Sequence, residues 1–246
     1  MQNNIQNNSI QSDIHLRREK PETNILCRDY LVMKPLILWL RDIAPKYASG
    51  ILVDYGCGNK PYLSFFQNKV TDYIGVDVSQ NEFNTVNYVI DTDDPLPFGA
   101  NSIDTLLSTQ VLEHTAEPEK YIKEISRVLK PGGHLILTCP GSYMLHEEPN
   151  DFFRFTKYGI QQLANKHQLR IITLDTAGGA WRLMGQIFLN HKAFGRKFKI
   201  PIISIIFYYF WVISSNTIFS VLDTLNLNDK ETVNYMIIAE KSINNE

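Results

Sequence analysis

The sequence is poor in cysteine and carries almost no net charge. Its three cysteines, Cys27, Cys57 and Cys139, are odd in number and far apart, so they predict neither a disulfide framework nor a CxxC zinc or redox motif. We therefore expect a reducing, cytoplasmic location. The formal net charge of -2 provides no basic surface for wrapping DNA or RNA, which disfavours bulk nucleic-acid binding.

The amino-terminal end lacks the apolar stretch that a secretory signal needs. Residues 1–22 are instead rich in Asn and Gln, and we expect them to form a flexible tail. Of the 246 residues, 44% are hydrophobic and 20% are charged, which is typical of a globular α/β domain. We expect that domain to cover residues 23–246 and to include an apolar helical insertion over residues 178–230.

Short apolar runs alternate with helix-like segments from residue 50 onwards. This order is typical of a mostly parallel sheet with helices on both faces. Each run is short enough to be a buried strand rather than a helix. The predicted strands cover residues 51–55, 72–76, 86–90, 103–108, 134–139, 170–174 and 233–239.

Three helices can be placed around these strands. The clearest begins near Pro118, since proline is favoured in the first turn of a helix, and we expect the Pro-Gly-Gly sequence at 131–133 to stop it. Thr156 is expected to cap a later helix. A covering helix is predicted over residues 31–44, and Pro35 limits where that helix can begin.

A tight glycine turn follows the first predicted strand. It reads Asp54-Tyr55-Gly56-Cys57-Gly58-Asn59-Lys60-Pro61, and such a turn lets the backbone approach a ligand closely. A Gly-x-Gly sequence alone is most often only a turn. The next strand, however, ends in Asp77, near the distance at which an acidic residue meets ribose hydroxyls in nucleotide-binding sheets. The third glycine of dinucleotide-binding loops is missing, which weakens an NAD interpretation.

Several motifs resemble those of class I S-adenosylmethionine-dependent methyltransferases, in particular methyltransferases of type 11. The motifs are Val53-Asp54-Tyr55-Gly56-Cys57-Gly58-Asn59-Lys60-Pro61-Tyr62, Tyr73-Ile74-Gly75-Val76-Asp77, Asp91 with Leu96-Pro97-Phe98, Gln110-Val111-Leu112-Glu113-His114, and Arg127-Val128-Leu129-Lys130-Pro131-Gly132-Gly133. The resemblance covers residues 50–175. It implies S-adenosylmethionine as cofactor and a Rossmann-like, seven-stranded, mostly parallel sheet with helices on both faces and an apolar helical insertion before the last strand.

The resemblance also implies a set of cofactor contacts. The expected contacts are Asp54, Gly56, Cys57, Gly58, Asp77, Val78, Asp91, Thr92, Ser108, Thr109 and Gln110. By this resemblance the two glycines admit the methionine part of the cofactor and Asp54 helps to hold its amino group. Asp77 takes the ribose hydroxyls, Asp91 faces the adenine amino group with Thr92 beside it, and residues 108–110 line the methionine side.

A second candidate segment follows the fifth predicted strand. It reads His146-Glu147-Glu148-Pro149-Asn150-Asp151-Phe152-Phe153-Arg154-Phe155-Thr156 and resembles a segment of methyltransferases associated with bacterial surface glycans. The resemblance implies a sugar or another small envelope-related acceptor. His146 is the predicted general base, since an imidazole pKa near 6.5 suits proton transfer at neutral pH. Arg154 either holds an acidic acceptor or organises the loop through Asp151.

His114 is a second candidate base, because it follows the fourth predicted strand beside the expected cofactor. Its alternative role is to support the loop at a helix entry. We predict no metal. His146, Glu147 and Glu148 have suitable chemistry, but neighbouring residues of one loop rarely converge on one ion.

The insertion contains an uncharged apolar run over residues 200–222. The run is long enough to cross a bilayer, but a single crossing would separate the last strand from its sheet. One alternative is a lid over the active site or a homodimer contact. The other is a peripheral contact, through residues 196–222, with the inner face of a membrane. The four cations Lys192, Arg196, Lys197 and Lys199 would then meet anionic headgroups.

Three functions remain open from the sequence. The first is O-methylation of a sugar or other small envelope-related acceptor. The second is C-methylation of a quinone-like or lipid-carried acceptor. The third is a non-catalytic protein that binds S-adenosylmethionine and stabilises a partner complex.

Overall fold

The computed structural model describes residues 20–91, 94–191, 201–225 and 230–243. Three sequence predictions fall outside these ranges. They are the tail over residues 1–19, the cofactor contact of Thr92, and the placement of the cations between residues 192 and 199.

Seven strands form one sheet in the order β3-β2-β1-β4-β5-β7-β6. The strands are β1 (Ile51–Tyr55), β2 (Asp72–Asp77), β3 (Tyr88–Val89), β4 (Ile103–Thr109), β5 (Leu129–Pro140), β6 (Leu169–Ala177) and β7 (Asn234–Lys241). Strands β1 to β5 pair in parallel, whereas β7 runs antiparallel to both β5 and β6. The predicted seven-stranded, mostly parallel sheet is therefore confirmed.

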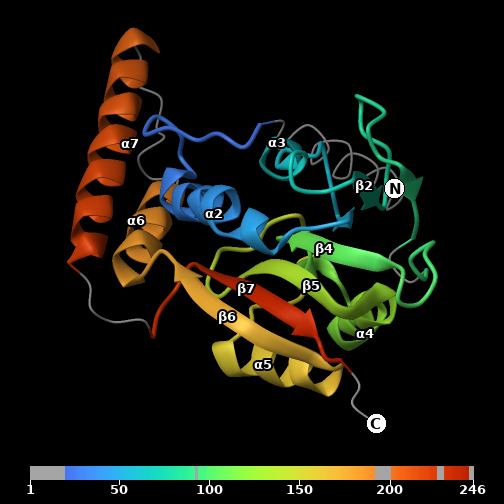
Figure 1. Ribbon diagram of the computed structural model, residues 1–246. Helices are drawn as coiled ribbons and strands as arrows, with labels where there is room; N and C mark the ends of the chain where they lie inside the picture. Colours follow the sequence, from blue (N-terminus) through green and yellow to red (C-terminus); the bar gives the residue numbers. More distant parts are fainter. Residues whose placement is uncertain (1–19, 92–93, 192–200, 226–229, 244–246) are drawn as a thin grey trace.

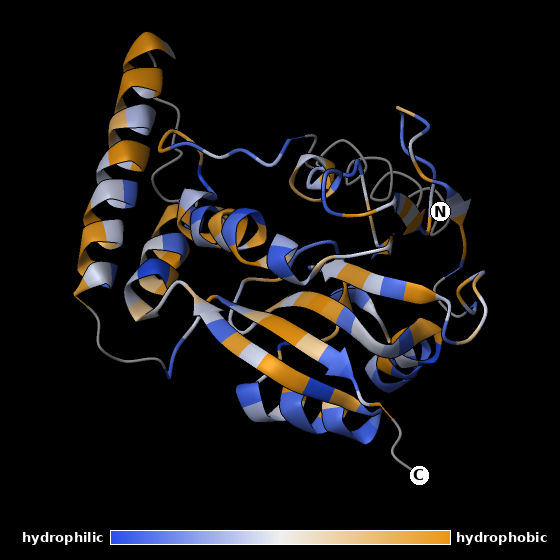
Figure 2. Ribbon diagram, viewed as in Figure 1, coloured by the Kyte–Doolittle hydropathy of each residue, from blue (hydrophilic) through white to orange (hydrophobic). Residues whose placement is uncertain are grey.

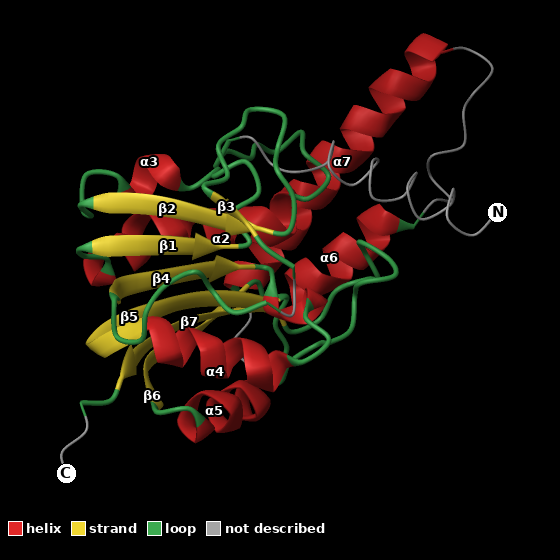
Figure 3. Ribbon diagram, turned by 90° about the vertical axis from the view of Figure 1, so that its right-hand side faces the viewer, coloured by secondary structure: helices red, strands yellow, loops and turns green. Residues whose placement is uncertain are grey.

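Helices cover both faces of the sheet (Figures 1 and 3). The helical elements are α2 (Tyr30–Asp42), η1 (Ala44–Tyr47), α3 (Leu63–Phe66), η2 (Leu112–His114), α4 (Pro118–Val128), α5 (Lys157–Lys166), α6 (Ala180–Asn190) and α7 (Pro201–Thr224). Side chains alternate along β5, so that Leu135 and Leu137 pack with α4 and α5 while Ile136 packs with α2 and α3. The sheet thus separates two apolar cores.

Two helix ends agree with the sequence and one differs. Pro118 lies in the first turn of α4, and the Thr156 side chain accepts a 3.1 Å hydrogen bond from the Gly159 amide at the start of α5. Helix α4, however, ends at Val128, before the predicted stop at 131–133. Leu129 is already extended and pairs with Ile103, because β5 begins there rather than at residue 134.

Helix α2 starts one residue before the predicted position, and Pro35 does not shift its start. The helix begins at Tyr30 and contains Pro35. Proline has no N–H group, so the carbonyl of Leu31 cannot receive the usual helical hydrogen bond from position 35. Nη1 of Arg182 donates to this carbonyl instead, at 3.3 Å. The guanidinium comes from α6, so the insertion satisfies the group that the proline leaves unpaired.

The insertion consists of α6 and α7. Helix α6 lies against α2, and α7 packs mainly on α6. Figures 1 and 3 both place the two helices on the side of the molecule where β1 and β4 end. In open α/β sheets this carboxyl edge is the side at which ligands bind.

Candidate active site

The glycine turn after β1 is held by hydrogen bonds on several sides. The Gly56 amide donates to the Val76 carbonyl at 2.8 Å, and the Gly58 carbonyl accepts from the Asn81 side chain at 2.8 Å. Gly56 has φ +80°, and a Cβ atom there would lie 2.3 Å from a methyl group of Val111. Only glycine fits this position. The close approach places Val111, and hence η2, directly against the turn.

Asp77 fixes the same turn from the end of β2. Its Oδ2 accepts from the Gly58 amide and its Oδ1 from the Val78 amide, both at 2.8 Å. The carboxylate is buried, as is Cys57, whereas the Val78 side chain is half exposed. A carboxylate can accept more than one hydrogen bond at each oxygen. Asp77 can therefore hold the turn and still accept from hydroxyl groups.

Asp54 presents a buried acceptor. Its Oδ2 accepts a 2.6 Å hydrogen bond from the Tyr73 hydroxyl. Its Oδ1 is buried without a hydrogen-bond partner in the described part of the chain. Burial raises the pKa of this carboxyl group to about 7, although the Tyr73 hydrogen bond opposes the rise. A buried acceptor without a donor costs free energy, so a ligand that brings an N–H donor would relieve Asp54.

The other expected cofactor contacts differ in accessibility. Asp91 is exposed after β3, and Thr109 is partly buried at the end of β4. Gln110 has φ +55° and its side chain donates to the Thr138 hydroxyl at 3.1 Å. Ser108 is fully buried, and its hydroxyl lies 2.8 Å from that of Tyr121. The Ser108 side chain therefore faces the core beneath the site.

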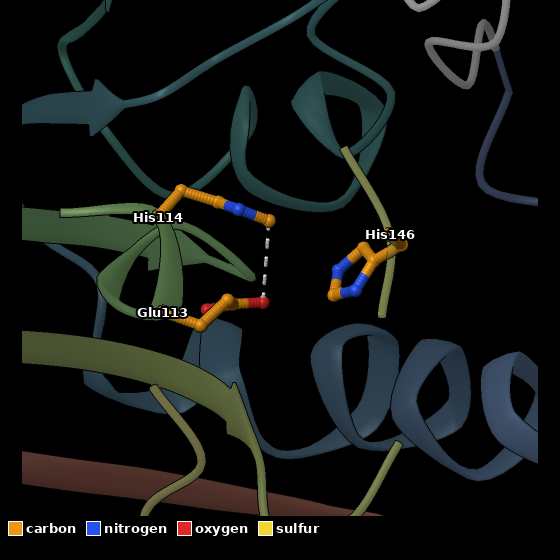
Figure 4. Close-up of side chains that lie close together, drawn as sticks. All are labelled: Glu113, His114 and His146. Carbon is orange, nitrogen blue, oxygen red and sulfur yellow. Dashed lines mark ion pairs between the residues drawn. The ribbon is translucent and has the colours of Figure 1, made fainter. Parts of the chain in front are cut away.

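Two histidines from different loops lie side by side. Their ring centroids are 4.8 Å apart, with His114 at the end of η2 and His146 in the loop after β5 (Figure 4). Nδ1 of His114 lies 2.8 Å from the carbonyl oxygen of Asn150. A carbonyl can only accept, so Nδ1 carries the proton and Nε2 of the neutral ring is an acceptor. The structure thus brings together the two bases predicted from the sequence.

Glu113 joins the two histidines and was not predicted as a site residue. Its Oε1 lies 3.8 Å from Nε2 of His114, and both carboxyl oxygens are buried without a hydrogen-bond partner among the described residues. Burial raises its pKa to about 8. The only sequence signal was its place beside His114 in a motif near the expected cofactor.

These three side chains have the chemistry of metal ligands. The donor atoms of Glu113, His114 and His146 all lie within 4.8 Å of one another, and carboxylates and imidazoles suit several divalent cations. The set differs from the three neighbouring residues weighed in the sequence, because it combines two loops. The expectation that no metal is needed stays a prediction.

Arg154 organises the loop that carries His146. It donates to both oxygens of Asp151, at 2.6 and 2.7 Å, and to the carbonyls of Tyr143, Met144 and Phe153. These five bonds match the five N–H donors of a guanidinium, and Nη2 also lies 3.3 Å from Nδ1 of His146. Of the two roles predicted for Arg154, pairing with Asp151 is present in the structure. Contact with an acceptor would require some of these bonds to be exchanged.

The Asp151 carboxylate also holds His146. Its Oδ2 accepts from the His146 amide at 3.0 Å and lies 3.2 Å from Nδ1 of the ring. Burial would raise the pKa of Asp151, but the hydrogen bonds from Arg154 and the amide outweigh it and lower the pKa to about 2. Burial lowers the pKa of His146. At neutral pH the imidazole is therefore neutral and can accept a proton.

Comparison with known proteins supports a methyltransferase domain. Residues 53–137 match a family model described as "Methyltransferase domain". An uncharacterized methyltransferase of Mycobacterium leprae is 30% identical over 110 residues, which cover 41% of this chain and 41% of that protein. An uncharacterized methyltransferase of Mycobacterium marinum is 32% identical over 110 residues, 41% of this chain and 43% of its own. The alignment thus spans less than half the length of these relatives.

Solved structures of low identity share the fold. A geranyl diphosphate methyltransferase in complex with SAM is 14% identical, with a TM-score of 0.54 over 83% of this chain and 83% of its own. The cyclase SpnF is 19% identical, with a TM-score of 0.54 over 85% of this chain and 82% of its own. A cyclase among these structures illustrates that the fold alone does not determine the reaction.

The matched residues extend from β1 into β5 and include the glycine turn, Asp77, Glu113 and His114. On the family match and the order of the strands, residues 53–137 are similar to methyltransferase domains.

Proposed function

We propose that the protein binds S-adenosylmethionine at the glycine turn and transfers its methyl group to a hydroxyl of a small acceptor. The observation that carries this proposal is the contact between Gly56 and Val111. Val111 directly precedes η2, which contains Glu113 and His114. A cofactor held at the glycine turn would therefore lie beside the histidines.

The cofactor would make two kinds of contact. Asp54 would accept from the ammonium group of the methionine part through its unpaired Oδ1, and Asp77 would accept from the ribose hydroxyls. Gly58 has no side chain, so its backbone can approach the cofactor closely, whereas Val111 fills the space beside Gly56. Cys57, Val78, Asp91 and residues 108–110 would complete the contacts, as the family resemblance implies.

The chemistry is an in-line displacement at the methyl carbon. The acceptor oxygen forms a bond to the methyl group while the bond from carbon to the sulfonium sulfur breaks, and the sulfur keeps the electron pair. The acceptor hydroxyl must also lose its proton. His146 is the proposed proton acceptor, because its ring is neutral at pH 7 and Asp151 holds the loop around it. Most of the rate gain would come from alignment, worth about 7 to 11 kcal/mol.

The acceptor class is the finer part of the proposal. A hydroxyl acceptor needs a base, and the pair His114 and His146 supplies two imidazoles at one place. We favour a sugar or another envelope-related molecule because the segment from His146 to Thr156 resembles methyltransferases associated with surface glycans. A carbon acceptor on a quinone-like or lipid-carried molecule is the second candidate.

Transfer of a labelled methyl group into cell-envelope extracts tests the proposal. The wild-type protein should label a product whose methyl group is bound to oxygen. His146→Ala should lower turnover about 100-fold or more and leave cofactor affinity within about twofold. His191→Ala, at an exposed histidine beyond α6, is the matched control and should retain turnover. Cofactor binding without any labelled product would favour a non-catalytic binding protein, and a methyl group on carbon would favour the second candidate.

A further inference from the structure

Helix α7 exposes far more apolar surface than a soluble helix usually does. Some of its apolar side chains are separated by three, four or eight residues in sequence, so they lie along one side of the helix. We call this set the apolar stripe. It consists of Ile202, Ile206, Phe210, Ile213 and Val221, all of them exposed. Figure 2 shows the helix as predominantly hydrophobic at the edge of the molecule.

The opposite side of α7 attaches the helix to the domain. Val212, Ser215 and Asn216 are buried, and the Asn216 side chain donates to the carbonyls of Ile25 and Cys27 at 2.8 and 2.9 Å. Near the end of α7, Asp223 binds Arg182 of α6 at 3.0 Å. These contacts fix which side faces outward. The apolar stripe therefore lies on the outer side of the anchored part of α7. The turns before Val212 also expose Ile203, Ile205 and Tyr209 on other sides.

A membrane span does not fit this attachment. The stretch Ile202–Thr224 is long and apolar enough to cross a bilayer, and 17% of its most apolar window is buried inside the protein. Yet α6 before it and β7 after it belong to the same domain, so both ends of α7 must stay on one side of a membrane. A helix that exposes apolar side chains can instead lie along the surface of the bilayer.

The charge of the surrounding sequence points to an anionic surface. The sequence between residues 176 and 222 has no Asp or Glu, and four cations, Lys192, Arg196, Lys197 and Lys199, precede α7. The whole chain, in contrast, has a net charge of -2. Anionic headgroups would attract these cations.

We propose that α7 lies on an anionic lipid surface with the apolar stripe buried at the boundary of headgroups and acyl chains. Helices α6 and α7 lie on the side where β1 and β4 end (Figures 1 and 3). The protein would therefore bind the membrane on the side of its histidine cluster, within reach of a lipid-linked acceptor. Lipid binding itself does not depend on the proposed methyl transfer.

Co-sedimentation of the full chain with lipid vesicles tests this proposal. The test variant carries Ile206→Ser and Phe210→Ser, whose side chains are 64% and 68% exposed. The matched control carries Ile243→Ser and Tyr158→Ser, at 65% and 75% exposure outside α7. Wild-type and control proteins should sediment with phosphatidylglycerol vesicles at low salt, less so at high salt, and weakly with phosphatidylcholine. The stripe variant should partition onto the vesicles at least about tenfold more weakly than the wild type.

Two results would overturn the proposal. One is a wild-type protein that stays in the supernatant with every vesicle at low salt. The other is equal partitioning of the stripe variant and the wild type. Light scattering after size-exclusion chromatography measures whether the protein is a dimer. A wild-type dimer that becomes a monomer in the stripe variant, without binding to vesicles, would also contradict the lipid proposal. Circular dichroism shows that each variant is folded. Calorimetry with S-adenosylmethionine is measured separately, and a failure to bind there bears on the proposed function alone.

Discussion

Nε2 of His114 lies 3.8 Å from Oε1 of Glu113, a carboxyl group that is fully buried and has no hydrogen-bond partner in the described part of the chain. The two residues are adjacent in η2, and His146 approaches them from another loop (Figure 4). A buried carboxyl group without a hydrogen-bond partner lowers the free energy of unfolding. Such an arrangement is typical of a site that is completed by a ligand.

Replacement of Glu113 by Gln should raise stability and lower turnover. The pKa of Glu113 is about 8 in the folded protein and near 4.3 when unfolded. The folded state therefore binds more protons between these values, and wild-type stability falls as pH rises through this window, by up to about 1.4 kcal/mol per pH unit. Gln removes this loss, so the gain in free energy of unfolding should grow from pH 5 to pH 8.

Denaturant unfolding at several pH values measures the gain. Glu117→Gln, at an exposed position of the same segment, is the control and should show no such trend. A Glu113→Gln protein that is less stable than wild type at pH 8 would contradict the pKa argument. A Glu113→Gln protein with full turnover would show that Glu113 is not part of the proposed site.

Asp54→Asn should weaken cofactor binding and remove part of its pH dependence. The pKa of Asp54 is about 7, so in the free protein the carboxylate that attracts an ammonium group forms as pH rises through neutrality. Wild-type affinity for S-adenosylmethionine should therefore increase from pH 5.5 to pH 7.5. The amide cannot ionise, and we expect an affinity about tenfold lower at pH 7.5, or roughly 1.4 kcal/mol. Calorimetry at both pH values measures these affinities. If the affinities of the variant and the wild type change with pH in parallel, Asp54 does not contact the cofactor.

Much of the sheet follows directly from short-range patterns. Strand β1 was predicted with its observed bounds, because a continuous apolar run between a glycine and the Gly-x-Gly turn leaves little freedom. Strand β3 is shorter than predicted, with two residues, Tyr88 and Val89. It is an edge strand with one neighbour, so fewer pairings define its ends.

The site could be predicted only in part. His114 and His146 were recognised separately, but their contact joins loops 32 positions apart in the chain, and hydrophobic periodicity does not report such distances. Glu113 was missed for the same reason, since the segment that packs beside it is distant in sequence: the Phe152 and Phe153 amides donate to its backbone carbonyl. The start of α2 was predicted to within one residue. The hydrogen bond from Arg182 that compensates for Pro35 comes from a distant helix and could not be predicted.

Arg154→Ala should destabilise the protein by about 3 kcal/mol, because it leaves the buried Asp151 carboxylate without its partner. The pKa of Asp151 is about 2 in the folded wild type, below its unfolded value. Its stabilising effect is thus present above about pH 4 and is lost as pH falls toward 2, so the difference between variant and wild type should shrink in acid. Arg170→Ala, which removes an exposed pair with Glu240, should cost about 1 kcal/mol or less. Equal losses in both variants would contradict this account.

Removal of divalent cations should leave turnover unchanged. The proposed base is an imidazole, and the methyl group is activated by its sulfonium, so the reaction as proposed needs no metal. Protein dialysed against a chelator should keep its activity and contain less than stoichiometric metal by elemental analysis. Activity that is lost on dialysis and restored by one cation would show instead that Glu113, His114 and His146 bind it.

Titration of the purified protein with S-adenosylmethionine in a calorimeter tests the central claim most directly. We predict saturable binding of one molecule per chain, weakened about tenfold or more by Asp77→Ala, and no comparable binding of NAD. A folded protein that releases no heat with S-adenosylmethionine, or that binds NAD in its place, would contradict the account.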